Sequence, residues 1–217
     1  MDALTEQIKN SDALSDEALA EKIDHFLHIH TEEVQTDGRD TFHCHRYEPT
    51  SYRVLHTLFE AFPLTDQDTL LDYGSGLGRL SFYTNHRFHN GAIGIEMSGA
   101  LHREALHNLN QYRGIHRERL TFLHGKAEDF VIPDEVTAAY CFNPFSTEIF
   151  RKVLTNLEKS YENKRRRITL ILYYPEDNTV FYIERHTGFR LLKEIAVPEL
   201  FGQDRRERFC IYQLGCV

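Results

Sequence analysis

The sequence predicts an α/β protein built around a mainly parallel sheet, and three observations lead to that prediction. From about Thr69 onward, short apolar runs alternate with stretches whose apolar residues recur at helical spacing, which is typical of β-α-β units. A glycine-rich turn follows the first apolar run. The last two runs are joined by a connector too short for a crossover, so we expect them to pair antiparallel.

Seven apolar runs are the expected strands, and helical stripes separate the first five of them. The expected strands are 69–73, 92–96, 120–124, 138–142, 168–174, 189–198 and 208–215. The expected helices of this part of the chain begin after the glycine turn and cover about 101–112, 149–157 and 177–186.

The chain before Thr69 has a different pattern. Residues 3–30 have the periodicity of one or two helices, 36–50 is polar and loop-like, and an apolar stripe at helical spacing follows over 52–62. We therefore expect residues 1–46 to form a helical N-terminal extension that lies against a sheet domain formed by the rest of the chain, 47–217.

The composition and charge of the chain limit the functional classes to which the protein could belong. Net charge is −8 over 217 residues, which disfavours broad binding to nucleic-acid phosphates. No long apolar run resembles a membrane span, and the acidic N-terminus lacks the features of a signal peptide. The four cysteines form no Cys-x-x-Cys pair. We therefore expect a reduced, cytoplasmic protein with no membrane partner.

A metal site is not expected, although the chain has 13 histidines. His43, Cys44 and His45 are adjacent, but no carboxylate or further cysteine follows at a ligand spacing. Surface or substrate-facing histidines are the preferred interpretation.

The stretch "TLLDYGSGLGRL" (69–80) places a glycine-rich turn between a strand and a helix. Such a turn lets a ligand approach the backbone and directs helix-start amides at it. A dinucleotide-binding turn would have its third glycine where this chain has Arg79. The Gly-Lys-Ser/Thr of a P-loop is absent. The spacing therefore disfavours both phosphate-binding patterns.

Two acidic residues indicate which ligand the turn would hold instead. Asp72 ends the first strand, where its charge would repel a pyrophosphate and attract an ammonium or sulfonium group. Glu96 ends the second strand, where a carboxylate accepts hydrogen bonds from ribose hydroxyls in nucleoside cofactors. Together these residues favour a nucleoside with a positively charged, amino-acid-like tail, and S-adenosylmethionine fits that description.

The stretches "LLDYGSGLGRL" and "AIGIEMS" resemble the first two motifs of class I S-adenosylmethionine-dependent methyltransferases. The resemblance covers about Arg46 to the C-terminus and implies a Rossmann-like fold with a seven-stranded, mainly parallel sheet and an antiparallel last strand. With "RYEPTSY", "CFNPFS" and "LILYYP", the chain is similar to a group of small bacterial methyltransferases.

The resemblance implies a set of cofactor-binding residues. "YEPT" (47–50) is similar to a loop that covers the methionine end of the cofactor in some members, although Thr50 or Ser51 could equally cap the following helix. Lys126 stands where many members have an acidic residue near the adenine. The expected cofactor-binding residues are Tyr47, Thr50, Asp72, Gly74, Ser75, Gly76, Gly78, Glu96, Met97, Ala127, Glu128 and Asn143.

"CFNPFS" (141–146) resembles the Asn/Asp-Pro-Pro-Tyr/Phe motif with which amino-group methyltransferases hold a planar amine. We accordingly expect Asn143, Pro144 and Phe145 to be catalytic residues, with Phe145 replacing the second proline. A purely structural role, with Pro144 ending a strand and Ser146 capping a helix, is the alternative.

The expected activity is methyl transfer to a nitrogen acceptor, in a small molecule or protein before RNA. The alternatives are a cofactor-binding regulator without catalysis, a methyltransferase acting on RNA, and a nucleotide-dependent oxidoreductase, which Asp72 and Arg79 argue against. His43, His45 and Glu48 are candidate bases if the acceptor must lose a proton. The loop 198–208 is expected either to border the substrate or to be a solvated turn.

Overall fold

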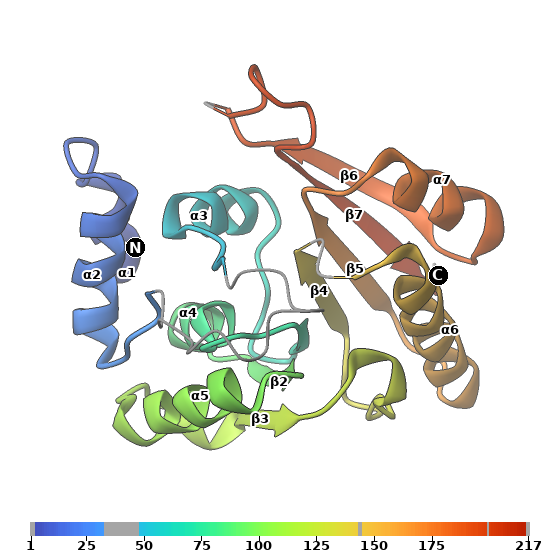
Figure 1. The fold of residues 1–217 in the computed structure, drawn as a ribbon, viewed down its shortest axis with the longest axis horizontal. Coiled ribbons are helices and arrows are strands. Elements are labelled where there is room, and N and C mark those ends of the chain that lie inside the picture. The colour runs from blue at the N-terminus through green and yellow to red at the C-terminus, as the bar shows by residue number, and fades with distance from the viewer. Residues whose placement is uncertain (1–2, 33–47, 143–144, 199, 216–217) are drawn as a thin grey trace.

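The computed structural model describes residues 3–32, 48–142, 145–198 and 200–215 (Figure 1). Its described residues form one seven-stranded sheet in the order β3-β2-β1-β4-β5-β7-β6. The strands are β1 (Thr69–Tyr73), β2 (Gly91–Glu96), β3 (Leu120–His124), β4 (Ala138–Phe142), β5 (Ile168–Tyr173), β6 (Arg190–Ala196) and β7 (Arg208–Leu214). These bounds confirm the expected strands to within two residues at each end.

The strand order reverses at β1, which pairs in parallel with β2 on one side and with β4 on the other. In an open α/β sheet such a reversal leaves a crevice at the carboxyl ends of the two central strands. β7 runs antiparallel to both β5 and β6, which confirms the expected antiparallel end of the sheet.

The helices of the described residues are α1 (Ala3–Lys9), α2 (Asp16–Leu27), α3 (Tyr52–Ala61), α4 (Arg79–Phe88), α5 (Gly99–Gln111), α6 (Thr147–Asn163) and α7 (Asp177–His186). Four of the described helices, α2, α3, α5 and α6, begin after a serine whose side chain caps them. Ser51 caps α3 by accepting a hydrogen bond from the Val54 amide, so the cap is Ser51 and not Thr50. Ser146 caps α6 in the same way, as one interpretation of the sequence expected.

Alternation along the strands divides the core between the two faces of the sheet. On one face, Leu70, Tyr140 and Ile171 pack with residues of α3, α4 and α5. On the other face, Leu71 and Cys141 pack with residues of α6 and α7. The result is a three-layer arrangement in which helices cover both faces of the sheet (Figure 1).

The two N-terminal helices pack on α3, at the left of Figure 1. Their buried side chains, among them Leu4 and Ile23, belong to the same hydrophobic cluster as the sheet residues of that face. The expected boundary between residues 46 and 47 lies outside the described residues.

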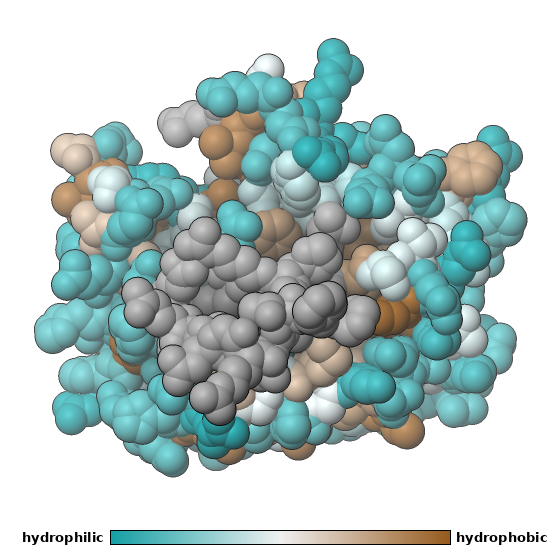
Figure 2. All heavy atoms as spheres, viewed as in Figure 1, coloured by the Kyte–Doolittle hydropathy of each residue, from teal (hydrophilic) through white to brown (hydrophobic). Residues whose placement is uncertain are grey.

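Outside the atoms drawn in grey, the face shown in Figure 2 is largely hydrophilic, and its hydrophobic side chains lie in small separate groups. Among the helices of the described residues, none has both the length and the apolar character needed to cross a membrane.

The glycine turn depends on backbone conformations that glycine adopts without strain. Gly74, Gly76 and Gly78 have φ values of 74°, 53° and 91°. A Cβ atom on Gly78 would lie 2.7 Å from the ring of Phe122 and 2.8 Å from the ring of Phe82. The third glycine of the turn is therefore required both by its conformation and by the packing of β3 and α4 against it.

Replacement of Gly78 by alanine should lower the free energy of unfolding by about 2 to 4 kcal/mol, because it adds backbone strain and overpacks two aromatic rings. Urea denaturation of the purified variant measures this. Gly202→Ala is the control, since a Cβ there meets nothing within 4 Å, and its effect should stay within about 0.5 kcal/mol. Equal stabilities of the two variants would contradict the packing described here.

Candidate active site

The glycine turn uses its own amides to bind the second strand. The amides of Gly74 and Ser75 both donate to the carbonyl of Ile95, at 2.9 and 3.1 Å. The amide of Gly76 donates to a carboxylate oxygen of Glu96 at 2.9 Å. Three donors that a phosphate-binding turn would direct at its anion are thus engaged with β2. The turn presents acidic side chains to a ligand and offers few free amides.

Glu96 is held in a fixed position at the end of β2. One carboxylate oxygen accepts from Gly76, and the other accepts from the amide of Ser98 at 2.7 Å. The side chain is only partly buried. Two backbone hydrogen bonds therefore orient the carboxylate while its free lone pairs stay accessible to hydroxyl donors.

Asp72 lies at the carboxyl end of β1, where it is 4% exposed. The pKa of Asp72 is raised to about 7, mainly by burial and in addition by the negative charge of Glu96, while the nearby Ser81 hydroxyl partly offsets both. The two carboxylates are thus close enough to repel each other through a poorly solvated region. A cationic group placed between them would relieve that repulsion.

Other expected cofactor residues lie in the turn and directly after β2 and β3. Ser75 is buried in the turn, and its side chain packs closely against Gly94 of β2. Met97 is 47% exposed directly after Glu96. Ala127 and Glu128 begin the short 3-10 helix η2 (Ala127–Asp129) that follows β3, with Ala127 buried and Glu128 partly buried.

Thr50 brings the N-terminal side of the chain to the centre of the sheet. Its hydroxyl lies 2.7 Å from the phenol oxygen of Tyr140 on β4. Tyr140 is the register partner of Asp72, so the two side chains lie side by side on one face. The segment 48–50 is therefore anchored next to the buried carboxyl. Sequence reasoning missed Tyr140, although strand pairing places it beside Asp72.

Phe145 is the one expected catalytic residue that the structure describes. Its ring packs edge-on against Tyr73, with 6.1 Å between ring centroids, and the buried Tyr73 hydroxyl has no hydrogen-bond partner among the described residues. Asn143 and Pro144 lie outside the described residues, as do Tyr47, His43 and His45.

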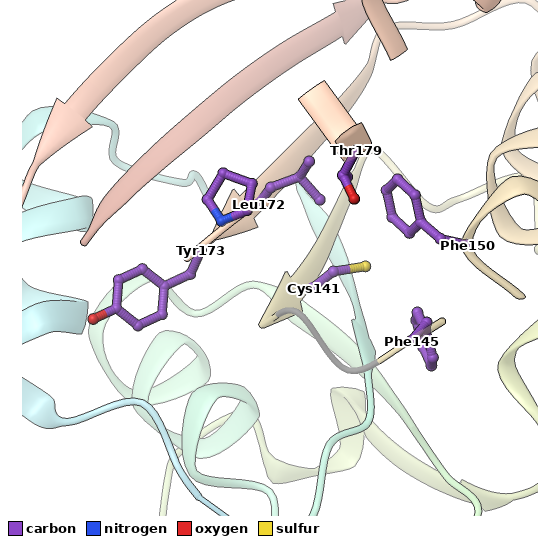
Figure 3. Close-up of a pocket in the computed structure, with 7 residues that line it drawn as sticks. Cys141, Phe145, Phe150, Leu172, Tyr173 and Thr179 are labelled. Atoms are coloured by element: carbon purple, nitrogen blue, oxygen red, sulfur yellow. The ribbon is translucent and has the colours of Figure 1, made fainter. Parts of the chain in front are cut away.

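A small, mainly apolar pocket opens beside Phe145, at the ends of β4 and β5 (Figure 3). Its lining includes Cys141, Phe145, Phe150, Leu172, Tyr173 and Thr179. The Cys141 thiol points toward Phe145 and Phe150, whereas the ring of Tyr173 points to the opposite side (Figure 3). Burial raises the pKa of the Cys141 thiol well above its usual value, so this thiol is an inert wall of the pocket.

The ring of Tyr173 lies in an acidic and aromatic environment. Its hydroxyl donates a hydrogen bond to Glu207. Burial raises the pKa of Tyr173 far above its usual value, and the charges of Glu207 and Glu48 add to that effect. The rings of Phe142 and Phe209 lie 4.8 and 4.7 Å from it between centroids. Within the described part of the chain, no ion pair joins Glu207 or Glu48 to a basic side chain.

The loop between β6 and β7 folds back onto the end of β5. Tyr174, with a φ of 54°, donates its hydroxyl to Asp204 at 2.7 Å. Arg206 forms an ion pair with Asp204 at 2.8 Å and lies 4.4 Å from the ring centre of Tyr174. The loop is therefore tied to the strand end that borders the pocket, and Arg206 is engaged within it.

The described residues show no evident site for a metal ion. Across the described residues, no group of three or more histidine, cysteine, aspartate or glutamate side chains could hold a metal ion.

No protein-family model matches the chain, and no curated protein matches its sequence. Solved structures match its fold. An RNA methyltransferase from Salinibacter ruber in complex with S-adenosyl-L-homocysteine has a TM-score of 0.55 at 16% identity, covering 77% of this chain and 92% of that chain. The glycopeptide N-methyltransferase MtfA complexed with S-adenosyl-L-methionine has a TM-score of 0.60 at 12% identity, covering 86% and 100%. YjhP from E. coli has a TM-score of 0.55 at 13% identity, covering 82% and 96%.

These similarities show that the chain has the fold of class I S-adenosylmethionine-dependent methyltransferases, as the sequence motifs implied. At 12 to 16% identity they concern the arrangement of the elements. The chemistry of this site has to be argued from its own residues.

Ionisation of Asp72 should make the stability of the ligand-free protein depend on pH. Since its folded pKa is about 7 and its ordinary value is 3.8, the folded state holds this proton more tightly, and stability falls as pH rises between the two values. Asp72→Asn should therefore be more stable than wild type by roughly 2 to 4 kcal/mol at pH 8, and by much less at pH 5.

Urea denaturation at the two pH values measures this difference. Asp66→Asn, at an exposed carboxyl, is the control and should show no comparable change. A stability difference between Asp72→Asn and wild type that is the same at both pH values would contradict the buried position of Asp72.

Proposed function

We propose that this chain is an S-adenosylmethionine-dependent methyltransferase that transfers the methyl group to a nitrogen acceptor. The observation that carries the proposal is the pair of carboxylates, Asp72 and Glu96, which flank a glycine turn whose amides are engaged elsewhere. This arrangement suits a ligand with a positive charge and hydroxyl donors, and it disfavours a diphosphate.

The residues at the turn fit the parts of S-adenosylmethionine. Glu96 would accept hydrogen bonds from the ribose hydroxyls, since its carboxylate is fixed and partly exposed. Asp72 would stabilise the positively charged methionyl end. Ser75 is also proposed to contribute to the site, since it lies buried within the turn. Gly74, Gly76 and Gly78 keep the backbone free of side chains there.

The bound cofactor would supply an activated methyl group, so the contribution of this chain is chiefly positioning. Tyr140 fixes Thr50 beside Asp72, which keeps the segment 48–50 over the carboxyl end of the sheet. Phe145 packed on Tyr73 provides a rigid wall at the end of β4. These side chains would orient an acceptor in line with the methyl group and exclude water from it.

A nitrogen acceptor is supported by the sequence of the loop after β4 and by the charge beside it. Asn143 and Pro144 occur in the order found where amino groups are held. Glu207 and Glu48 both lie close enough to influence Tyr173, in a region with aromatic walls. Carboxylates and aromatic faces favour a basic amine. Glu48, as well as His43 and His45, would be available to take a proton from such an amine.

The acceptor is proposed to be a small molecule or a protein side chain in the cytoplasm, because a net charge of −8 disfavours contact with RNA phosphates. Methylation of RNA is the second candidate, since solved structures of similar fold include an RNA methyltransferase and a putative tRNA methyltransferase. A cofactor-binding regulator without catalysis is the third.

Calorimetric titration should show that the protein binds S-adenosylmethionine and S-adenosylhomocysteine and does not bind NADH. Asp72→Ala and Glu96→Ala should each lose most of this affinity, because each removes one side of the acidic pair. Glu104→Ala, at an exposed carboxylate on α5, should bind like wild type. Preferential binding of NADH would overturn the proposed cofactor, and unchanged affinity of Asp72→Ala would overturn its role.

Cell extract can be separated into protein, RNA and metabolite fractions, and each fraction incubated with the protein and S-adenosylmethionine that carries a labelled methyl group. We expect the label to appear in the metabolite or protein fraction. Asn143→Ala should keep its affinity for the cofactor and lose turnover, since the side-chain amide is proposed to hold the acceptor. Asn163→Ala, exposed at the end of α6, should retain turnover. Label in RNA would favour the second candidate, and full activity of Asn143→Ala would remove that residue from the mechanism.

A further inference from the structure

The backbone just after α2 is bound to the glycine turn through a buried side chain of α5. The Asn108 amide nitrogen donates to the carbonyl of Leu77 at 3.0 Å and to the carbonyl of His30 at 2.7 Å. Its amide oxygen accepts from the backbone of His30 at 2.8 Å. Asn108 is 2% exposed, and Leu77 lies between the second and third glycines of the turn. One side chain thus joins residue 30 to the turn.

A second connection starts from the other side of Gly78. Arg79 begins α4 and is 5% exposed. Its guanidinium donates to the Thr31 hydroxyl at 2.7 Å, to the Thr31 carbonyl at 3.1 Å and to Glu32 at 2.7 Å. The same group lies 4.7 Å from the ring centre of Tyr52. The two residues that flank Gly78 in sequence are therefore both connected to the segment 30–32.

Asp24 of α2 also binds the segment 30–32, through hydrogen bonds from Thr31. Its carboxylate accepts from both the amide and the hydroxyl of Thr31, the latter at 2.9 Å, and from the Tyr52 hydroxyl at 2.5 Å. Asp24 and Thr31 are almost completely buried. Buried polar groups of this kind stabilise one arrangement strongly, because removal of any member leaves the others without partners.

We propose that the segment 30–32 is a positioning element of the cofactor site, which braces the glycine turn and couples its occupancy to the N-terminal helices. The inference rests on the proposed function. Because Leu77 and Arg79 flank Gly78, the last glycine of the turn, loss of their contacts with residues 30–32 frees backbone that must be ordered around the ligand. By thermodynamic linkage, a ligand that fixes the turn also stabilises the segment 30–32 and the end of α2.

Variants that remove the contacts between residues 30–32 and the glycine turn test whether these contacts raise the affinity for the cofactor. Asn108→Ala and Thr31→Val should each weaken the binding of S-adenosylhomocysteine by about tenfold, measured by calorimetry. Thr31→Ser retains the hydroxyl and should restore most of the affinity. The control is Arg53→Ala, which removes contacts with Ser11 and the Leu14 carbonyl at the other end of α2 and should bind like wild type.

Hydrogen exchange on the wild-type protein provides a readout that needs no variant to fold. S-adenosylhomocysteine should slow exchange of the amides of residues 24–31 as well as those of the turn. The positioning role of residues 30–32 would be contradicted if exchange slowed at the turn alone. It would also be contradicted if wild type, Asn108→Ala and Thr31→Val bound S-adenosylhomocysteine with equal affinity. Neither result would contradict the proposed cofactor. A wild-type protein that binds neither S-adenosylmethionine nor S-adenosylhomocysteine would instead overturn the proposed function on which the brace depends.

Discussion

The electrostatic interaction between two carboxylates at the centre of the sheet is the constraint on which the site depends. Asp72 is buried at the end of β1, and the charge of Glu96 acts on it from the end of β2. Keeping both ionised without a nearby cation is unfavourable in a poorly solvated place. The folded chain therefore contains a pair of groups that a positively charged ligand would stabilise, at the point where the glycines leave room for one.

The fold supplies this pair through its topology. Reversal of the strand order at β1 brings the ends of β1, β2 and β4 to one edge, where their side chains converge. Tyr140 enters this group as the strand partner of Asp72, and it connects Thr50 to the sheet. At the neighbouring end of β5, Tyr173 and Glu207 extend the same polar region toward the expected acceptor side.

Local patterns in the sequence were sufficient to predict the strands and the starts of most helices. Most strands alternate or run apolar over their own length, and Ser51 and Ser146 cap helices within three residues of themselves. Contacts between distant residues could not be predicted in this way. The sequence shows only that Arg79 stands where a dinucleotide-binding turn has its third glycine. In the structure its guanidinium donates a hydrogen bond to Thr31, 48 positions earlier. The raised pKa of Asp72 likewise depends on burial by several elements.

The ionisation state of Asp72 with and without ligand tests the central claim most directly. The carbon-13 chemical shift of its carboxyl carbon can be followed against pH, with assignment by the spectrum of Asp72→Asn. The account predicts a pKa of about 7 for Asp72 in the free protein and a clearly lower value when S-adenosylmethionine is bound. An ordinary carboxyl pKa in the free protein, or a pKa that the ligand leaves unchanged, would contradict it.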